Sequence, residues 1–197
     1  MKYSGNIKSV YAPLGASNHS KYSREENDYY ATHPSSIDHL FAVEKFSKNI
    51  WECACGEGHL SKRMSALGKN VYSTDLIDRN FGHDHFDFLT TTKKWRGDII
   101  TNPPYKYADK FVYKAMELTN NKVAMFLKLT FLESMGRIAL FEKYPPIRIL
   151  VYSFRQPVAR NGSKIMFGKS SAVCFAWFIW ELGFHGKPAI DWIKYKK

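Results

Sequence analysis

Short apolar runs separated by polar turns recur along most of the chain, and several have the length of a β-strand. Each of these runs contains β-branched or aromatic residues, which are typical of strands. Five of them are residues 48–54, 70–74, 97–101, 122–129 and 148–152. A sixth run, residues 172–180, is apolar on both faces. It predicts a central strand that helices cover on both sides.

Between these runs, apolar residues return every three or four positions, which is the spacing of an amphipathic helix. This spacing predicts helices over residues 59–67, 108–118 and 131–141, the last one ended by Pro145-Pro146. Another helix is predicted over residues 35–46, with Ser35 or Ser36 as its N-cap. Because strands alternate with helices, we expect an α/β fold with a doubly wound sheet and right-handed crossovers.

The run over residues 97–101 leads directly into Asn102-Pro103-Pro104-Tyr105. Two prolines fix the backbone and remove two N–H donors, and Asn102 is held in the extended region because a proline follows it. The Asn102 side chain and the Pro103 carbonyl then provide two fixed acceptors beside an aromatic ring. Such a site suits a planar amine, with Tyr105 stacked on the ring that carries it. Taken alone, the four residues also fit a plain turn that ends a strand.

A glycine turn joins the first predicted strand to the helix over residues 59–67. Gly56 and Gly58 allow a tight turn and a close approach of a ligand to the backbone, and the helix start offers unpaired N–H groups. A dinucleotide-binding turn would have a third glycine where Ser61 stands, and here the acid Glu52 precedes the turn. An acid in that place suits a ligand that carries an ammonium and a sulfonium.

Two further acids follow in an order that fits such a ligand. Asp75 ends the run 70–74, where a doubly wound fold places the acid that accepts ribose hydroxyls. Asp87 could accept a hydrogen bond from an adenine amine, and Phe88 beside it could stack on the base. Taken singly, acids of this kind are often turn residues or helix caps. Their order with the glycine turn and residues 102–105 favours a cofactor site.

Together these motifs resemble those of the S-adenosylmethionine-dependent methyltransferases. Within them, the chain resembles the amino-methyltransferases that modify adenine N6 in DNA, in a small single-domain form known from phages. Residues 52–58 resemble the first cofactor motif, Asp75 the second, Asp87-Phe88 the third and residues 102–105 the catalytic motif. The resemblance covers most of the chain. It implies a Rossmann-like, mostly parallel sheet whose last strand is antiparallel and lies beside the fifth.

The resemblance also implies roles for individual residues, and residues 28–34 resemble a segment that closes over the methionine part of the cofactor. The implied cofactor-binding residues are Tyr30, Thr32, Pro34, Glu52, Ala54, Gly56, Gly58, Asp75, Leu76, Asp87, Phe88 and Asn102. The implied catalytic residues are Asn102, Pro103, Pro104 and Tyr105. The family often has Phe where Ala54 or Cys55 stands, so the chain departs from the pattern there.

Composition agrees with a compact enzyme that acts on an anionic partner. The 197 residues are 45% hydrophobic and 16% aromatic, which argues for one well-buried domain and against disorder. The net charge of +11 favours nucleic acid as the partner. No apolar run reaches the roughly 20 residues of a membrane span and no signal peptide is evident, so we expect a cytoplasmic protein in a bacterial or phage-infected cell. Three cysteines without a second pair predict reduced thiols and no metal site.

Basic residues concentrate in a long glycine-containing loop that begins at residue 153. Such a loop could grip phosphates, and Arg155, Gln156 or Asn161 could brace the gap that a flipped base leaves. The same charges also fit an exposed hairpin. The expected nucleic-acid-binding residues are Tyr105, Arg155, Gln156, Arg160, Asn161, Lys164 and Lys169.

Residues 1–27 are polar and lack a hydrophobic period, so we expect a partly mobile segment there and one domain over residues 28–197, without a separate target-recognition domain. The expected activity is methylation of adenine N6 in DNA with S-adenosylmethionine. Methylation of adenine in RNA or of a glutamine amide in a protein uses the same chemistry and stays open. So does a nucleic-acid-binding module that keeps the fold without catalysis.

Overall fold

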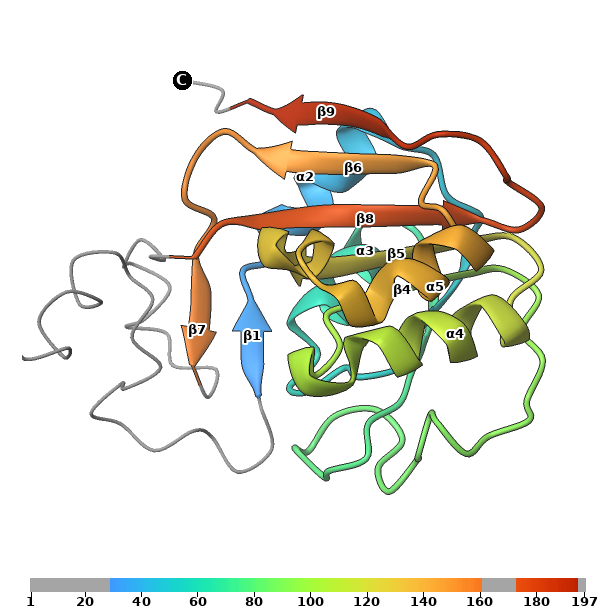
Figure 1. Ribbon diagram of the computed structural model, residues 1–197. Coiled ribbons are helices and arrows are strands. Elements are labelled where there is room, and N and C mark those ends of the chain that lie inside the picture. Colours follow the sequence, from blue (N-terminus) through green and yellow to red (C-terminus); the bar gives the residue numbers. More distant parts are fainter. Residues whose placement is uncertain (1–28, 161–172, 195–197) are drawn as a thin grey trace, which may run out of the picture.

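A seven-stranded sheet forms the centre of the protein, in the order β3-β2-β4-β5-β8-β6-β9 (Figure 1). The computed structural model describes residues 29–160 and 173–194. The first half of the sheet consists of four parallel strands, which are β2 (Asn49–Glu52), β3 (Asn70–Ser73), β4 (Asp98–Thr101) and β5 (Lys122–Lys128). These strands match four of the predicted runs, and the doubly wound, mostly parallel α/β sheet is confirmed.

The second half of the sheet contains the antiparallel strand. β8 (Phe175–Glu181) lies between β5 and β6 (Arg148–Tyr152) and runs antiparallel to both. The prediction of an antiparallel strand beside the fifth strand is therefore confirmed. However, β8 is not the last strand, because β9 (Ala189–Ile193) follows it and pairs parallel to β6 at the sheet edge. Four of the five β9 residues are exposed, so β9 lacks the apolar pattern by which the other strands were predicted.

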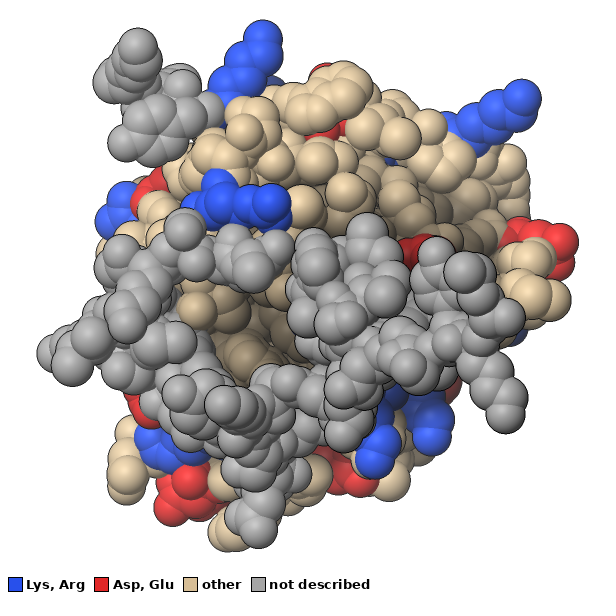
Figure 2. Space-filling model, turned by 60° about the vertical axis from the view of Figure 1, so that its left-hand side comes forward, with Lys and Arg blue, Asp and Glu red and all other residues tan. Residues whose placement is uncertain are grey.

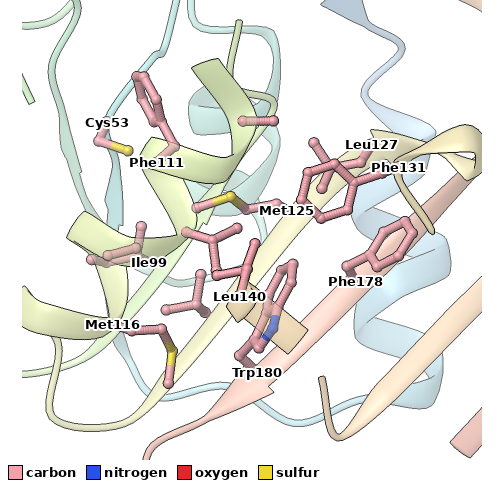
Figure 3. Close-up of a cluster of buried hydrophobic side chains, with 14 of the residues drawn as sticks. Cys53, Ile99, Phe111, Met116, Met125, Leu127, Phe131, Leu140, Phe178 and Trp180 are labelled. Carbon is pink, nitrogen blue, oxygen red and sulfur yellow. The ribbon is translucent and has the colours of Figure 1, made fainter. Parts of the chain in front are cut away.

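Helices cover both faces of the sheet (Figure 1). One face carries α2 (Ser35–Val43) and α3 (His59–Ala66), and the other carries α4 (Ala108–Leu118) and α5 (Ile138–Lys143). Because side chains alternate along a strand, β8 supplies Phe178 and Trp180 to the core under α4 and α5, as Figure 3 shows, and Trp177 to the core under α2 and α3. The strand is thus buried on both faces, as its sequence predicts.

Two helix predictions need correction. The segment over residues 131–141 is a pair of 3-10 turns (Leu129–Leu132 and Met135–Arg137) before the short α5. Only part of its apolar spacing faces the core, because Phe131 and Leu140 are buried whereas Met135 is 91% exposed and Ile138 is 53% exposed. The predicted N-cap of α2 is also wrong, since Pro34 occupies that position and the Ser35 hydroxyl lies 2.8 Å from His33 Nδ1.

A small two-stranded sheet lies beside the main one and was not predicted. β1 (Tyr30–Thr32) pairs antiparallel with β7 (Val158–Arg160), so that Tyr30 faces Arg160 and Thr32 faces Val158. Three-residue strands are too short to give a periodic pattern. The pairing brings the start of the described chain onto the basic loop. Asn161, Lys164 and Lys169 lie outside the described residues, as do residues 1–28.

Candidate active site

The carboxyl ends of the parallel strands open into one cavity of about 1060 Å³. In doubly wound sheets this edge is where ligands bind. Figure 2, which turns the β1–β7 side forward, shows a hollow in the molecule with Lys and Arg side chains at several places around it. The residues that line the cavity and that the sequence predicted are Tyr30, Thr32, Glu52, Ala54, Asp75, Leu76, Asp87, Phe88, Asn102, Pro103, Pro104 and Tyr105. Pro34, Gly56 and Gly58 are not among its lining residues.

Asn102, directly after β4, has its side chain fixed from one side. Asn102 Nδ2 donates to the carbonyl oxygen of Tyr30 at 2.6 Å and to Thr32 Oγ1 at 2.8 Å. Because a backbone carbonyl can only accept, the amide nitrogen must face Tyr30. Asn102 Oδ1 therefore points the other way, and this buried atom has no hydrogen-bond partner among the described residues. An unpartnered buried oxygen is costly, so it is an acceptor suited to a donor group of a ligand.

Aromatic rings and a cation surround the Tyr105 side of the cavity. The Tyr105 ring lies 5.7 Å from the Tyr30 ring and 6.1 Å from the Phe175 ring, measured between centroids. Lys128 Nζ lies 4.6 Å from the centre of the Tyr105 ring, which is a cation–π contact. Sequence reasoning missed Lys128, although it ends β5 and strand ends supply residues to this edge. Arg137 is a second lining cation that was missed.

Asp75, which follows β3, is hydrogen-bonded to the glycine turn. Asp75 Oδ2 accepts from the backbone N–H of Gly56 at 2.8 Å, and Oδ1 accepts from Ile77 N–H and from Arg79 Nη1. Arg79 also lies 4.3 Å from the centre of the Tyr29 ring. The Tyr29 ring fills the space beside Gly56, where an added Cβ would come within 2.5 Å of it. Both Arg79 and Tyr29 line the cavity and were not among the predicted site residues. The contacts of Tyr29 with Gly56 and Arg79 join distant parts of the sequence, whereas Arg79 and Asp75 are only four residues apart.

Glu52, at the end of β2, is buried and lines the same cavity. Its carboxylate accepts a hydrogen bond from the Ser61 hydroxyl, which lies 2.6 Å from the Ser73 hydroxyl. Burial raises the pKa of Glu52 to about 8, and the bond from Ser61 opposes the rise. Ser61, which replaces the third glycine of a dinucleotide-binding turn, therefore holds the acid that precedes the turn.

Both residues of the third motif, Asp87 and Phe88, line the cavity, and Phe88 is also part of the hydrophobic core. Asp87 Oδ1 accepts from the backbone N–H of Leu89 at 2.9 Å, which is a local turn bond. Phe88 is only 2% exposed, stacks on Phe111 with the ring centroids 5.2 Å apart, and meets Trp51 edge to face. Because Phe111 covers a face of the Phe88 ring, Phe88 offers the cavity little more than an edge.

The predicted nucleic-acid-binding residues are not all gathered at the cavity. Tyr105 lines it, whereas Arg155 and Gln156 do not. Gln156 is 2% exposed and its Nε2 donates to Ser35 Oγ at 3.3 Å, so its side chain packs against the start of α2. Arg155 Nη1 lies 2.9 Å from Cys174 Sγ. Arg160 is placed only through its backbone in β7.

Two searches of the described ranges, 29–160 and 173–194, gave negative results. No group of three or more His, Cys, Asp or Glu side chains is arranged to hold a metal ion. None of the helices found there combines the length and the apolar character that crossing a membrane requires.

Comparison with known proteins assigns the fold. No protein-family model matches the chain, and no curated protein matches it. Solved structures do match it, and they define the fold as the Rossmann-like sheet of class I S-adenosylmethionine-dependent methyltransferases. A protein of Listeria monocytogenes provisionally described as a member of that class superposes with a TM-score of 0.59 at 14% identity, covering 90% of this chain and 69% of that chain.

Two other solved structures are similar over most of this chain. A protein of Pyrococcus horikoshii, provisionally described as an RNA methyltransferase, has a TM-score of 0.59 at 15% identity, covering 90% of this chain and 98% of that chain. The modification subunit of a provisionally described type I restriction enzyme from Vibrio vulnificus has a TM-score of 0.55 at 11% identity, covering 96% of this chain and 51% of that chain. At such identities the likeness establishes the fold alone.

Proposed function

We propose that the protein is a methyltransferase that transfers a methyl group from S-adenosylmethionine to the exocyclic N6 amine of adenine in DNA. The observation that carries the proposal is the anchored amide of Asn102, whose Oδ1 is buried and has no hydrogen-bond partner in the described parts of the chain. A planar amine is the donor that such an acceptor suits. The ring of Tyr105 in the same cavity suits the base that carries the amine.

The cavity fits S-adenosylmethionine through the chemistry of its acids. Glu52 would accept from the ammonium, Asp75 from the ribose hydroxyls, and Asp87 from the adenine amine. Gly58 keeps the turn before α3 tight, because it adopts a φ of 79° and a Cβ there would meet the Phe81 ring. The cofactor would supply a methyl group on a positively charged sulfur, which is already electrophilic.

The protein's own residues then need to orient and polarise the amine. Asn102 Oδ1 and the Pro103 carbonyl would accept its two hydrogens and draw the nitrogen lone pair out of conjugation with the ring. The new N–C bond forms as the S–C bond breaks, and the methylated amine releases a proton to water. No strong general base is needed, because the nitrogen becomes acidic once it is methylated. Positioning therefore supplies most of the catalysis.

Charge and the cations beside the cavity support a nucleic-acid substrate over a protein amide. The chain carries a net charge of +11, and Lys128 and Arg137 line the cavity. A negative substrate is attracted to such a surface. DNA is the form that we propose, with adenine flipped out of the duplex so that its N6 reaches the cavity.

The test is incubation with labelled S-adenosylmethionine and separate duplex DNA, single-stranded DNA, RNA and protein substrates, followed by nucleoside and amino-acid analysis. We expect label in N6-methyldeoxyadenosine. Label in RNA alone, or in glutamine, would overturn the DNA assignment while keeping the methyltransferase. A protein that binds no S-adenosylmethionine in calorimetry would instead be a binding module that has kept the fold.

A further inference from the structure

A second, smaller cavity of about 360 Å³ lies between α4 and α5. Figure 1 shows the two helices side by side on the front face of the sheet. Lys110, Lys114 and Tyr113 of α4 line this cavity together with Lys143 of α5 and Tyr144, which follows it. Leu89 lines both this cavity and the candidate active site, so the two hollows are neighbours on one surface.

Lysines and tyrosines alternate along the way from one cavity to the other. Lys106 Nζ lies 5.2 Å from the centre of the Tyr107 ring, and both residues line the active-site cavity. One helical turn further, Lys110 Nζ lies 5.6 Å from the same ring. Lys106 lies in the 3-10 turn Tyr105–Tyr107 that precedes α4, and Lys110 and Lys114 lie four residues apart on one side of α4.

The far end of this row carries two rings and another cation. The rings of Tyr113 and Tyr144 meet nearly edge to face, with centroids 5.9 Å apart. Lys143 Nζ lies 5.7 Å and 5.2 Å from their centres. We call the set Lys106, Lys110, Tyr113, Lys143 and Tyr144 the α4–α5 surface.

Acidic side chains leave two lysines of this surface, Lys110 and Lys143, without an ion pair among the described residues. Glu117 is the acid in the second cavity, and it is already paired with Lys114 at 3.1 Å and with Lys94 at 3.9 Å. Asp109 and Glu142 do not line the cavity. Lys110 and Lys143 are both exposed.

We propose that the α4–α5 surface binds the nucleic-acid strand next to the target adenine, with phosphates on the lysines and a neighbouring base on Tyr113. The nature of the ligand rests on the proposed function. Lysines interleaved with aromatic rings are how proteins hold single strands, because the charges follow the backbone while bases stack on the rings.

The charge part of the proposal is tested by binding, without any turnover. The double variant Lys110→Gln/Lys143→Gln is compared with Lys48→Gln/Lys187→Gln, which removes two exposed lysines that precede β2 and β9 and line neither cavity. Affinity for a fluorescent single-stranded DNA with one central adenine is measured by anisotropy over a range of salt concentrations. The α4–α5 variant should bind on the order of tenfold more weakly at 0.1 M salt, and its salt slope should fall by about 1.4. The control pair should leave both unchanged.

The stacking part is tested with Tyr113→Ala against Tyr113→Phe. Loss of the ring should weaken strand binding by roughly 5-fold or more, whereas Phe keeps the ring and should bind like wild type. The surface lies to one side of the active site. The binding defect of Tyr113→Ala should therefore disappear when the oligonucleotide is shortened on the side of the adenine that reaches this surface. The defect should persist when the oligonucleotide is shortened on the other side. S-adenosylmethionine affinity, measured in parallel, should not change.

The outcomes separate this proposal from the proposed function. If wild type methylates DNA but both lysine pairs weaken binding equally, or neither does, the α4–α5 surface is wrong and the proposed function stands. If wild type binds the strand through this surface but methylates no nucleoside, the proposed function fails and the surface stands. A wild-type protein that binds neither DNA nor RNA overturns both.

Discussion

Among single residues, Asn102 has the clearest structural reason for a chemical role, because its amide nitrogen is bound by the chain and its oxygen is left for a ligand. Replacing it with Ala should lower the rate of methyl transfer by about 10²- to 10³-fold, which is the usual loss when one hydrogen-bonding group of a polar transition-state site is removed. Affinity for S-adenosylmethionine should fall far less, because Glu52 and Asp75 remain. Single-turnover transfer and calorimetry measure the two effects, and wild-type transfer by the variant would exclude this mechanism.

Variants of Thr32 test whether methyl transfer depends on the hydrogen bond that fixes the Asn102 side chain. Thr32 Oγ1 accepts one of the two amide hydrogens, and Thr32 is 2% exposed. Thr32→Val keeps the shape but leaves that hydrogen without a partner, which costs about 1–3 kcal/mol. We expect transfer to slow by roughly tenfold or more, with little change in the cofactor dissociation constant. Thr32→Ser retains the hydroxyl and should stay close to wild type; equal losses in both variants would point to packing.

Glu52 predicts a pH-dependent cofactor affinity. Its pKa is raised by burial from 4.5 to about 8, so the carboxyl is largely protonated at pH 6 and must lose a proton to pair with an ammonium. Affinity for S-adenosylmethionine should rise between pH 6 and pH 7.5 by up to about tenfold per pH unit. Calorimetry in buffers with different ionisation enthalpies should detect the released proton. In Glu52→Gln the affinity should be low and nearly independent of pH.

The same raised pKa predicts how folding stability responds to pH. Between about 4.5 and 8 the folded protein holds a proton on Glu52 that the unfolded chain has released. The free energy of unfolding attributable to this group is therefore highest below pH 4.5 and decreases as pH rises toward 8. Glu52→Gln should remove this component in denaturant titrations at several pH values. An unchanged pH dependence in the variant would mean that the pKa of Glu52 is not raised in the folded protein.

At the scale of the element, α3 depends on the two glycines that flank it. Gly58 is its N-cap with a φ of 79°, and Gly68 follows its C-terminal end with a φ of 82°. A Cβ added to Gly58 would lie 2.3 Å from the Phe81 ring, whereas a Cβ added to Gly68 would have no atom within 4 Å. Both substitutions by Ala should cost about 1–2 kcal/mol for the left-handed backbone. Gly58→Ala should cost more in denaturant unfolding, and it alone should weaken cofactor binding. Equal effects on stability and on cofactor binding would argue against a special role for this turn.

Elements with enough length to show a pattern could be predicted from the sequence. β6 was predicted with its observed bounds, and β8 was predicted as a doubly buried strand, because long apolar runs leave few alternatives. β1 and β7 could not be predicted, since each has three residues and their pairing joins parts of the chain more than 120 residues apart. β9 was missed because its residues face solvent rather than the core.

The same distinction applies to the candidate site. Glu52, Asp75 and Asn102 could be brought together by reasoning, because Glu52 lies near the end of a predicted strand, Asp75 and Asn102 each follow one, and parallel strands end at one edge. Lys128, which ends β5, could have been placed at the site by the same argument. The bonds from Asn102 to Tyr30 and Thr32 could not be predicted, because they join residues 70 or more positions apart and β1 is too short to give a periodic pattern.

At the scale of the whole molecule, the net charge of +11 should act on the substrate and not on the cofactor. A polyanion that binds many lysines and arginines releases counterions, so its affinity falls steeply with salt. Between about 50 and 200 mM salt, the KM for DNA should rise by at least tenfold. The dissociation constant of S-adenosylmethionine should change little, because its proposed contacts lie in a partly enclosed cavity, where salt screens less. A KM that is flat over this range would mean that the positive charge does not bind the substrate, and would favour a protein amide as the methyl acceptor.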